Sequence, residues 1–233
     1  MPHIHLLTGA GSGIGRAIAL RLAHRGDRLI LVARDAERAA QLGDEFDAVA
    51  TIAADLRHPD SLARAFARAD LPDLVDSVVH AAGIVELGGV GDLPVDAWSS
   101  QLAVNLISAA EITRLLLPAV RAAQGQIVFL NSGAGLTAHP SWAAYAASKH
   151  GLKALADALR GEEAAHGVRV TTVYPGRAAT PMQAKVHEQE GQEYDPSRFI
   201  DPESVATAVL TALDLPRDAV ISDLTVRPGP RPR

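Results

Sequence analysis

The sequence predicts an α/β fold, a doubly wound parallel β-sheet of about seven strands with helices on both faces. Two observations support this prediction. Short runs rich in β-branched residues alternate with longer Ala- and Leu-rich stretches along the whole chain, which is the pattern of successive βαβ units. Most of the short runs are also continuously apolar, as expected of strands that are covered on both faces.

Seven runs are predicted as strands. In chain order they are Ile4–Thr8, Leu29–Ala33, Ala48–Ala53, Leu74–His80, Gln126–Asn131, Val168–Tyr174 and Ala219–Ser222. Between them apolar residues recur at helical spacing, and helices are predicted near Ile14–Arg25, Ala36–Gln41, Asp60–Ala69, Val95–Ala123, Trp142–His166 and Pro202–Leu213. No internal repeat and no shift in composition marks a linker, so residues 1–233 are expected to form one domain.

Composition narrows the classes of function. The chain is 48% hydrophobic, as is usual for a globular protein, and its formal charge of −5 leaves no basic surface for nucleic acid. The absence of cysteine excludes a disulfide scaffold, a thiolate metal site and a cysteine nucleophile. Residues 1–5 lack the features of a signal peptide, and no uninterrupted apolar run reaches the length of a membrane span. We therefore expect a cytoplasmic protein with neither a nucleic-acid nor a membrane partner.

The segment Thr8–Gly15 contains four glycines between the first predicted strand and the first predicted helix. Glycines at such a junction let the backbone turn sharply and approach a pyrophosphate, while the helix N-terminus offers free N–H groups. No Lys-Ser/Thr pair follows, which excludes a P-loop. A tight structural turn can use similar glycines, but the position at the first strand–helix junction favours a dinucleotide site and a Rossmann-like sheet.

Residues at the end of the second predicted strand bear on the choice of dinucleotide. An acid there would bind the ribose hydroxyls and select NAD, whereas an arginine nearby can hold the 2′-phosphate of NADP. Here Ala33 takes the strand end, Arg34 follows, and Asp35 is expected to cap the helix that begins at Ala36. NADP(H) is therefore favoured, with NAD(H) as the alternative if Arg34 is only a solvated loop cation.

Ser132, Tyr145 and Lys149 form a candidate catalytic group. Tyr145 and Lys149 are four residues apart at the start of a predicted helix, so their side chains share one face. A phenol with a pKa near ~10 is a poor acid–base group at neutral pH unless a cation stabilises its anion, and the Lys149 ammonium would do so. Ser132 could donate a hydrogen bond to the same substrate oxygen. Because such Tyr–Lys pairs are also common on helix surfaces, this prediction depends on the motifs around it.

Taken together, these motifs resemble the short-chain dehydrogenase/reductase family, in its compact form, over nearly the whole chain. The glycine turn matches TGxxxGxG, residues 145–149 match YxxxK, and residues 175–180 match PGxxxT. With Arg34 added, the residues expected to contact the dinucleotide are Gly9, Ser12, Gly13, Ile14, Gly15, Arg34, Asp55, Leu56, Ala82, Gly83, Tyr145, Lys149, Pro175, Gly176 and Thr180. The resemblance implies an NAD(P)-dependent oxidoreductase without a metal, assembled as a homodimer or homotetramer through its two long helices.

The resemblance also implies a catalytic tetrad of Ser132, Tyr145, Lys149 and Asn105. Tyr145 would protonate a carbonyl oxygen or deprotonate an alcohol, and Ser132 would position that oxygen. Lys149 would lower the pKa of Tyr145 and bind the nicotinamide ribose, and Asn105 would hold a water of a proton relay. By itself Asn105 is equally a structural amide in an apolar helix stripe. His80 stands where the family usually has asparagine, and we expect it to be structural.

The substrate is expected to be a small alcohol or carbonyl compound. Residues 180–200 are expected to form a flap over the site, and residues 227–233, rich in Pro and Arg, a flexible tail. Four residues expected near the pocket favour an apolar or aromatic carbonyl compound: Leu136, His139, Trp142 and Met182. Trp142 and Met182 are alternatively simple packing residues. Arg177 either meets an anionic substrate group or is a solvated loop cation.

A second class of function uses the same fold. A non-catalytic NADP(H)-binding protein could regulate a partner, but it would not need the tetrad, all four members of which are present. A serine hydrolase is excluded because residues 130–134 do not form a Gly-x-Ser-x-Gly elbow.

Overall fold

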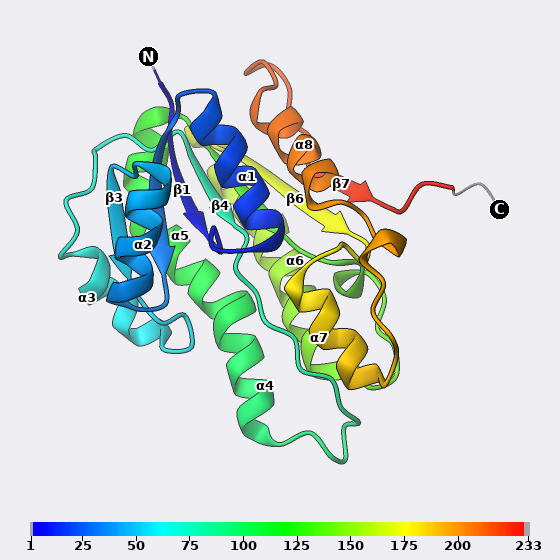
Figure 1. Cartoon of the computed structure of the whole chain (residues 1–233). Coiled ribbons are helices and arrows are strands. Elements are labelled where there is room, and N and C mark those ends of the chain that lie inside the picture. The colour runs from blue at the N-terminus through cyan, green and yellow to red at the C-terminus, as the bar shows by residue number, and fades with distance from the viewer. Residues whose placement is uncertain (1, 231–233) are drawn as a thin grey trace.

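A seven-stranded parallel sheet forms the centre of the structure, a computed structural model that describes residues 2–230. Its strands are β1 (Ile4–Thr8), β2 (Arg28–Ala33), β3 (Ala50–Ala53), β4 (Ser77–His80), β5 (Gln126–Leu130), β6 (Arg169–Pro175) and β7 (Asp223–Val226). They lie in the order β3-β2-β1-β4-β5-β6-β7, and every neighbouring pair is parallel (Figure 1). The predicted fold class is confirmed.

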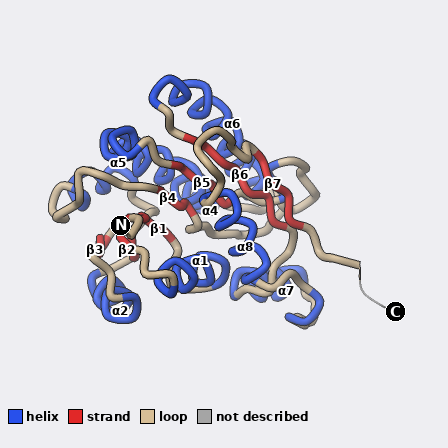
Figure 2. The backbone as a smooth tube through the Cα atoms, turned by 90° about the horizontal axis from the view of Figure 1, so that it is seen from above, coloured by secondary structure: helices blue, strands red, loops and turns tan. Residues whose placement is uncertain are grey.

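Helices cover both faces of this sheet, as Figure 2 shows. One apolar cluster packs α1 (Gly13–His24), α2 (Ala36–Phe46) and α8 (Pro202–Leu213) against one face of the strands. A second cluster packs α3 (Leu62–Phe66), α5 (Ser108–Ala123) and α6 (Ala143–Glu163) against the other. Because both faces are covered, the inner strands are buried along their length, which explains their continuously apolar sequences.

The predicted helix Val95–Ala123 is continuous but not uniform. It consists of α4 (Val95–Leu102), a π-helical segment at Ala103–Ile107 and then α5. By length and composition this helix could cross a membrane, a property that the sequence reading missed. Half of its apolar window is buried inside the protein, however, and its inward side chains pack on the sheet.

The prediction of the seventh strand was wrong. The strand is Asp223–Val226, whereas Ala219–Ser222 lies before it. The carbonyl oxygens of Ile221 and Ser222 accept hydrogen bonds from Thr171 Oγ1 and from the Thr172 N–H. As an edge strand, β7 alternates exposed with half-buried residues, so a search for continuously apolar runs passes over it.

The segment 180–200, expected to form a flap, contains helix α7 (Pro181–Glu190), which the sequence analysis did not predict. Thr180 caps this helix by accepting a hydrogen bond from the Gln183 N–H, Pro181 takes its first position, and Gly191 ends it at φ +65°. All three signals are present in the sequence and could have located the helix. Figure 1 shows α7 and α4 at the same end of the sheet.

Candidate active site

The site lies where the strand order reverses, at the carboxyl ends of β1 and β4. The backbone segments that follow these two strands cross to opposite faces of the sheet, which opens a crevice between them. Thr8 Oγ1 accepts hydrogen bonds from the N–H groups of Ala81 and Ala82, each at 3.1 Å, and so joins the two loops. The loop after β1 is therefore held against the loop after β4.

Glycine is required at two positions of the first loop. Gly9 has φ +74°, and a Cβ there would lie 2.7 Å from the Ala82 nitrogen. A Cβ on Gly15 would lie 2.2 Å from the Gly9 carbonyl oxygen. The turn thus closes tightly enough to place the start of α1 beneath the crevice, with free backbone N–H groups facing it.

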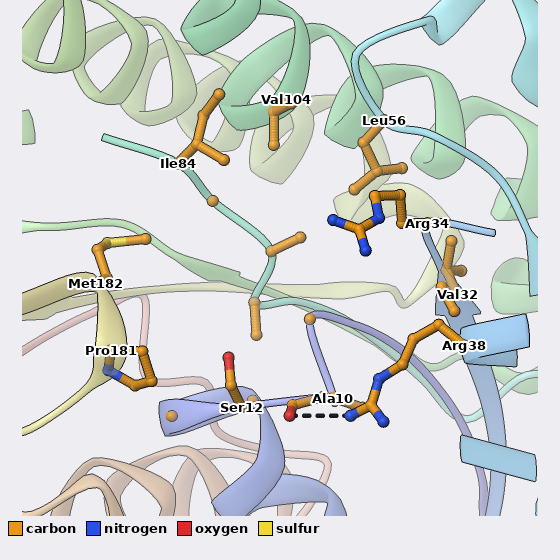
Figure 3. A pocket seen from close by; sticks show the side chains of 18 of the residues that line it. Ala10, Ser12, Val32, Arg34, Arg38, Leu56, Ile84, Val104, Pro181 and Met182 are labelled. Carbon is orange, nitrogen blue, oxygen red and sulfur yellow. Dashed lines mark hydrogen bonds between the residues drawn. The ribbon is translucent and has the colours of Figure 1, made fainter. Parts of the chain in front are cut away.

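A pocket of about 660 Å³ extends from this turn past the ends of β2 and β3 (Figure 3). Most of the residues predicted for the dinucleotide line it: Gly9, Ser12, Gly13, Ile14, Gly15, Arg34, Asp55, Leu56, Ala82, Gly83 and Thr180. The length and the glycine cradle of this pocket fit a dinucleotide whose pyrophosphate lies at the N-terminus of α1.

Two arginines lie at the β2 end of the pocket, as Figure 3 shows. The Arg34 side chain is 74% exposed and pairs with Asp35 at 3.2 Å. Asp35 also caps α2 by accepting from the Arg38 N–H at 2.8 Å, as predicted. Sequence reasoning missed Arg38, whose guanidinium donates to the Gly11 carbonyl oxygen at 3.1 Å. Arg38 lies in the first turn of α2, three residues after the predicted cap Asp35, and this spacing could have identified it.

The Asp55 carboxylate is already engaged by a neighbour. Arg57 donates from Nε to both carboxylate oxygens and from Nη2 to Oδ2, and these hydrogen bonds, opposed in part by burial, lower the pKa of Asp55. Arg57 lines the pocket as well and was not predicted. The pair therefore presents a fixed, charged edge to the pocket.

A second pocket, of about 460 Å³, adjoins the first and shares Ile14, Val85, Thr180 and Met182 with it. Ser132 and Tyr145 both line the second pocket, together with Pro175 and Gly176. The two pockets thus meet at the loop after β6 and the start of α7. This geometry brings the predicted catalytic hydroxyls to one end of the predicted dinucleotide cleft.

Ser132 lies two residues after the end of β5 and is held by its neighbours. It begins a short 3₁₀ turn, where its side chain accepts from the Ala134 N–H at 3.1 Å. Buried Asn131, which sequence reasoning did not select, accepts from the Ser132 N–H at 2.8 Å and donates to the Lys149 carbonyl oxygen at 3.0 Å. Asn131 therefore ties the serine loop to the helix that carries Tyr145 and Lys149.

Tyr145 and Lys149 are both buried on one face of α6. Burial raises the pKa of the Tyr145 phenol, contrary to the lowering expected from Lys149, and a hydrogen bond with the Ser132 side chain opposes part of that rise. The Lys149 ammonium donates to the Leu130 carbonyl oxygen at 2.9 Å and lies 5.8 Å from the centre of the tyrosine ring. Burial lowers the pKa of Lys149 to about 8. Lys149 lines neither pocket, but its ammonium lies 3.8 Å from a Cβ placed on Gly83, which lines the first pocket.

Asn105 lies in the π-helical segment and is 2% exposed. Its Oδ1 accepts from the Ile84 N–H at 2.8 Å, and its Nδ2 donates to the Ile84 carbonyl oxygen at 2.9 Å and to Ser148 Oγ at 3.0 Å. Asn105 thus fixes the loop after β4 to the helix of Tyr145 and Lys149. These contacts are those of a positioning residue.

Comparison with known proteins agrees with this geometry. Residues 3–191 match the family model of short-chain dehydrogenases. The chain belongs to the short-chain dehydrogenase/reductase family. It is 32% identical to an uncharacterized short-chain type dehydrogenase/reductase of Sinorhizobium fredii, over 97% of this chain and 91% of that protein. The enzyme is therefore an oxidoreductase that acts on CH–OH and C=O groups.

Two solved structures resemble the enzyme over nearly its whole length. One is a serine dehydrogenase complexed with NADP⁺, with a TM-score of 0.84 and 25% identity, covering 96% of this chain and 94% of that one. The other is a short-chain dehydrogenase from Burkholderia cenocepacia in complex with NADP, with a TM-score of 0.81 and 25% identity, covering 97% and 88%.

This short-chain dehydrogenase keeps His80 as a neutral, internal residue. His80 stacks on Phe129 with 4.9 Å between ring centres, and its Nε2 lies 3.0 Å from Thr113 Oγ1. Burial lowers the pKa of His80 to about 3, and the ring lines neither of the two large pockets. These contacts agree with the structural role expected for it.

Three of the four residues expected near the substrate line the second pocket. His139, Trp142 and Met182 line the second pocket, whereas Leu136 is 43% exposed and outside its lining. Arg177 stacks over Trp142 at 5.7 Å, and its guanidinium pairs with Glu190 of α7 at 2.6 and 2.8 Å. Arg177 is thus a paired cation that holds α7 against the pocket.

Proposed function

We propose that the enzyme catalyses NADPH-dependent reduction of a small carbonyl compound, or oxidation of the corresponding alcohol, with Ser132, Tyr145 and Lys149 as catalytic residues. One observation carries this proposal: Ser132 and Tyr145 line a substrate-sized pocket that opens into a cleft fitting a dinucleotide. A bound nicotinamide dinucleotide supplies or accepts the hydride. The protein itself has to bind the dinucleotide and the substrate, orient them, and transfer a proton.

Tyr145 is the proton donor in the direction of reduction. Because burial raises its pKa, the phenol is protonated at neutral pH, which is the form that gives a proton to a carbonyl oxygen. Ser132, which hydrogen-bonds to the same phenol, positions that oxygen. In the reverse direction the Lys149 ammonium stabilises the tyrosinate. Asn105 and Asn131 hold the loops of this group, and a relay water at Asn105 remains a prediction.

NADP(H) is the preferred dinucleotide in this proposal. Arg34 and Arg38 place two guanidinium groups at the β2 end of the cleft, where the ribose 2′-phosphate would lie. The strand end itself, Ala33, carries no acid that would repel the phosphate. The NADP complexes of the two structural relatives support the same choice.

The protein is proposed to act as a homodimer or homotetramer in the cytoplasm. Ala147, Ala154 and Ala158 are exposed along α6, and Ile107 is exposed on the neighbouring long helix. Small side chains of this kind permit close helix approach between subunits. Light scattering at micromolar concentration tests the proposal, and a monomer would contradict it.

The mechanism is tested by Tyr145→Phe, assayed with NADPH and NADH against a panel of aldehydes, ketones, diketones and quinones. This change removes one hydroxyl, so fold and NADPH binding should persist while turnover falls by ~10²–10⁴-fold. Tyr194→Phe, a hydroxyl removal in the segment after α7, serves as the matched control and should retain activity. Near-full activity of Tyr145→Phe with a good substrate would refute the mechanism.

The alternative, a regulatory NADP(H)-binding protein on the same fold, makes a different prediction for the panel. It would bind NADPH without turning over any carbonyl compound or alcohol. The complete arrangement of Ser132, Tyr145 and Lys149 at the end of the cleft favours the enzyme.

A further inference from the structure

We infer that the substrate carries an anionic group, such as a carboxylate, and that Arg227 binds it. This inference rests on the proposed function and names the substrate class for the same site. Arg227 lies within residues 227–233, expected from the sequence to be a flexible tail; of these, residues 231–233 lie outside the described part. In the structure, Arg227 lines the second pocket.

The backbone beside Arg227 is fixed by the sheet. Arg227 is the first residue after β7, whose last residue, Val226, pairs in register with Pro175 of β6. The Gly176 N–H also donates to the Val226 carbonyl oxygen at 2.8 Å. The pairing of β7 with β6 therefore places Arg227 next to the loop after β6, where the first and second pockets meet.

The Arg227 guanidinium lies against the residue that follows the catalytic serine. A Cβ placed on Gly133 would lie 2.7 Å from Arg227 Nη1 and 3.6 Å from its Cζ. The missing side chain at position 133 thus makes room for the guanidinium beside Ser132. Ser132, Tyr145 and Arg227 line the same pocket, so we place the anionic group of a substrate held by the two hydroxyls against this guanidinium.

The charges around the pocket favour an anion. Arg227 and Arg177 line it, and none of its lining residues is acidic, although the whole chain has a formal charge of −5. Arg177 is neutralised by Glu190. Among residues 2–230, Arg227 forms no ion pair with an acidic side chain. Arg227 is itself exposed, so water screens its charge, but no acidic residue of the pocket competes with a carboxylate for it.

Matched pairs of substrates test this inference. The enzyme is assayed with NADPH on acetoacetate against acetoacetamide, and on 4-carboxybenzaldehyde against 4-formylbenzamide, pairs that differ chiefly in charge. We expect kcat/KM for at least one acid to exceed that of its amide about tenfold or more, as a hydrogen-bonded ion pair allows. Arg227→Gln should remove this preference mainly through KM, and Arg227→Lys should restore part of it.

A control separates this effect from a general loss of charge. Arg64→Gln removes an exposed cation on α3, away from the pocket, and should leave the preference unchanged. Equal turnover of acids and amides by the unmutated enzyme, or an equal loss for both in Arg227→Gln, would overturn the inference while leaving the oxidoreductase proposal intact. Failure to turn over any carbonyl compound or alcohol would overturn both.

Discussion

Replacing Lys149 by methionine should stabilise the folded protein while abolishing its activity. Methionine keeps the length of the side chain but removes an ammonium that is buried and bonded to one carbonyl oxygen. A pKa of about 8 in place of 10.5 corresponds to about 3 kcal/mol of unfavourable free energy for the buried charge. The lost hydrogen bond offsets part of this gain, so we expect an increase in unfolding free energy of about 1–3 kcal/mol at pH 7.

The pH dependence gives the sharper measurement. Between the folded pKa of about 8 and the unfolded value of 10.5, the unfolded chain holds the proton that folded Lys149 has lost. The unmutated protein should therefore become more stable relative to Lys149→Met as pH rises through this window. Urea unfolding at pH 7 and at pH 10 tests this, with Lys153→Met as control, because Lys153 lies on the same helix but its pKa is raised by Asp157. A stability difference that stays constant with pH would refute the reasoning.

Three further predictions concern the cleft. Gly15→Ala should sharply lower NADPH affinity, measured by fluorescence titration, and also the melting temperature, because the new Cβ would overlap the Gly9 carbonyl oxygen. Gly161→Ala, at an open helix position, should lower neither quantity. Asn105→Ala should lower the unfolding free energy in urea by ~1–3 kcal/mol and also slow turnover, since three hydrogen bonds are lost. Arg34→Ala combined with Arg38→Ala should weaken NADPH binding about tenfold or more with little change for NADH, and equal losses for both would contradict the assigned roles.

Much of this enzyme could be predicted from local sequence. Strands buried on both faces must be apolar throughout, so β1, β2 and β5 were recognisable without tertiary information. The glycine turn was also recognisable in the sequence. Only glycine fits at position 15, because a Cβ there would lie 2.2 Å from the Gly9 carbonyl oxygen. The cap at Asp35 also depends on neighbours within a few residues. In each of these cases the residue type is required by the strand, turn or helix end in which it lies, so a short stretch of sequence is enough to recognise it.

The remaining features depend on residues far apart in the chain. The π-helical segment around Asn105 is accompanied by contacts with Ile84 and Ser148, which no local pattern links. Arg227 was assigned to a flexible tail because residues 227–233 are rich in Pro and Arg, yet the pairing of β7 with β6 brings its side chain against Gly133. The sequence by itself determined the family and the sheet, and it supplied the residues that we propose for catalysis. The tertiary structure alone decided which cations line the second pocket and which of them are paired, because charge pairing such as that of Arg177 with Glu190 depends on packing between separate elements.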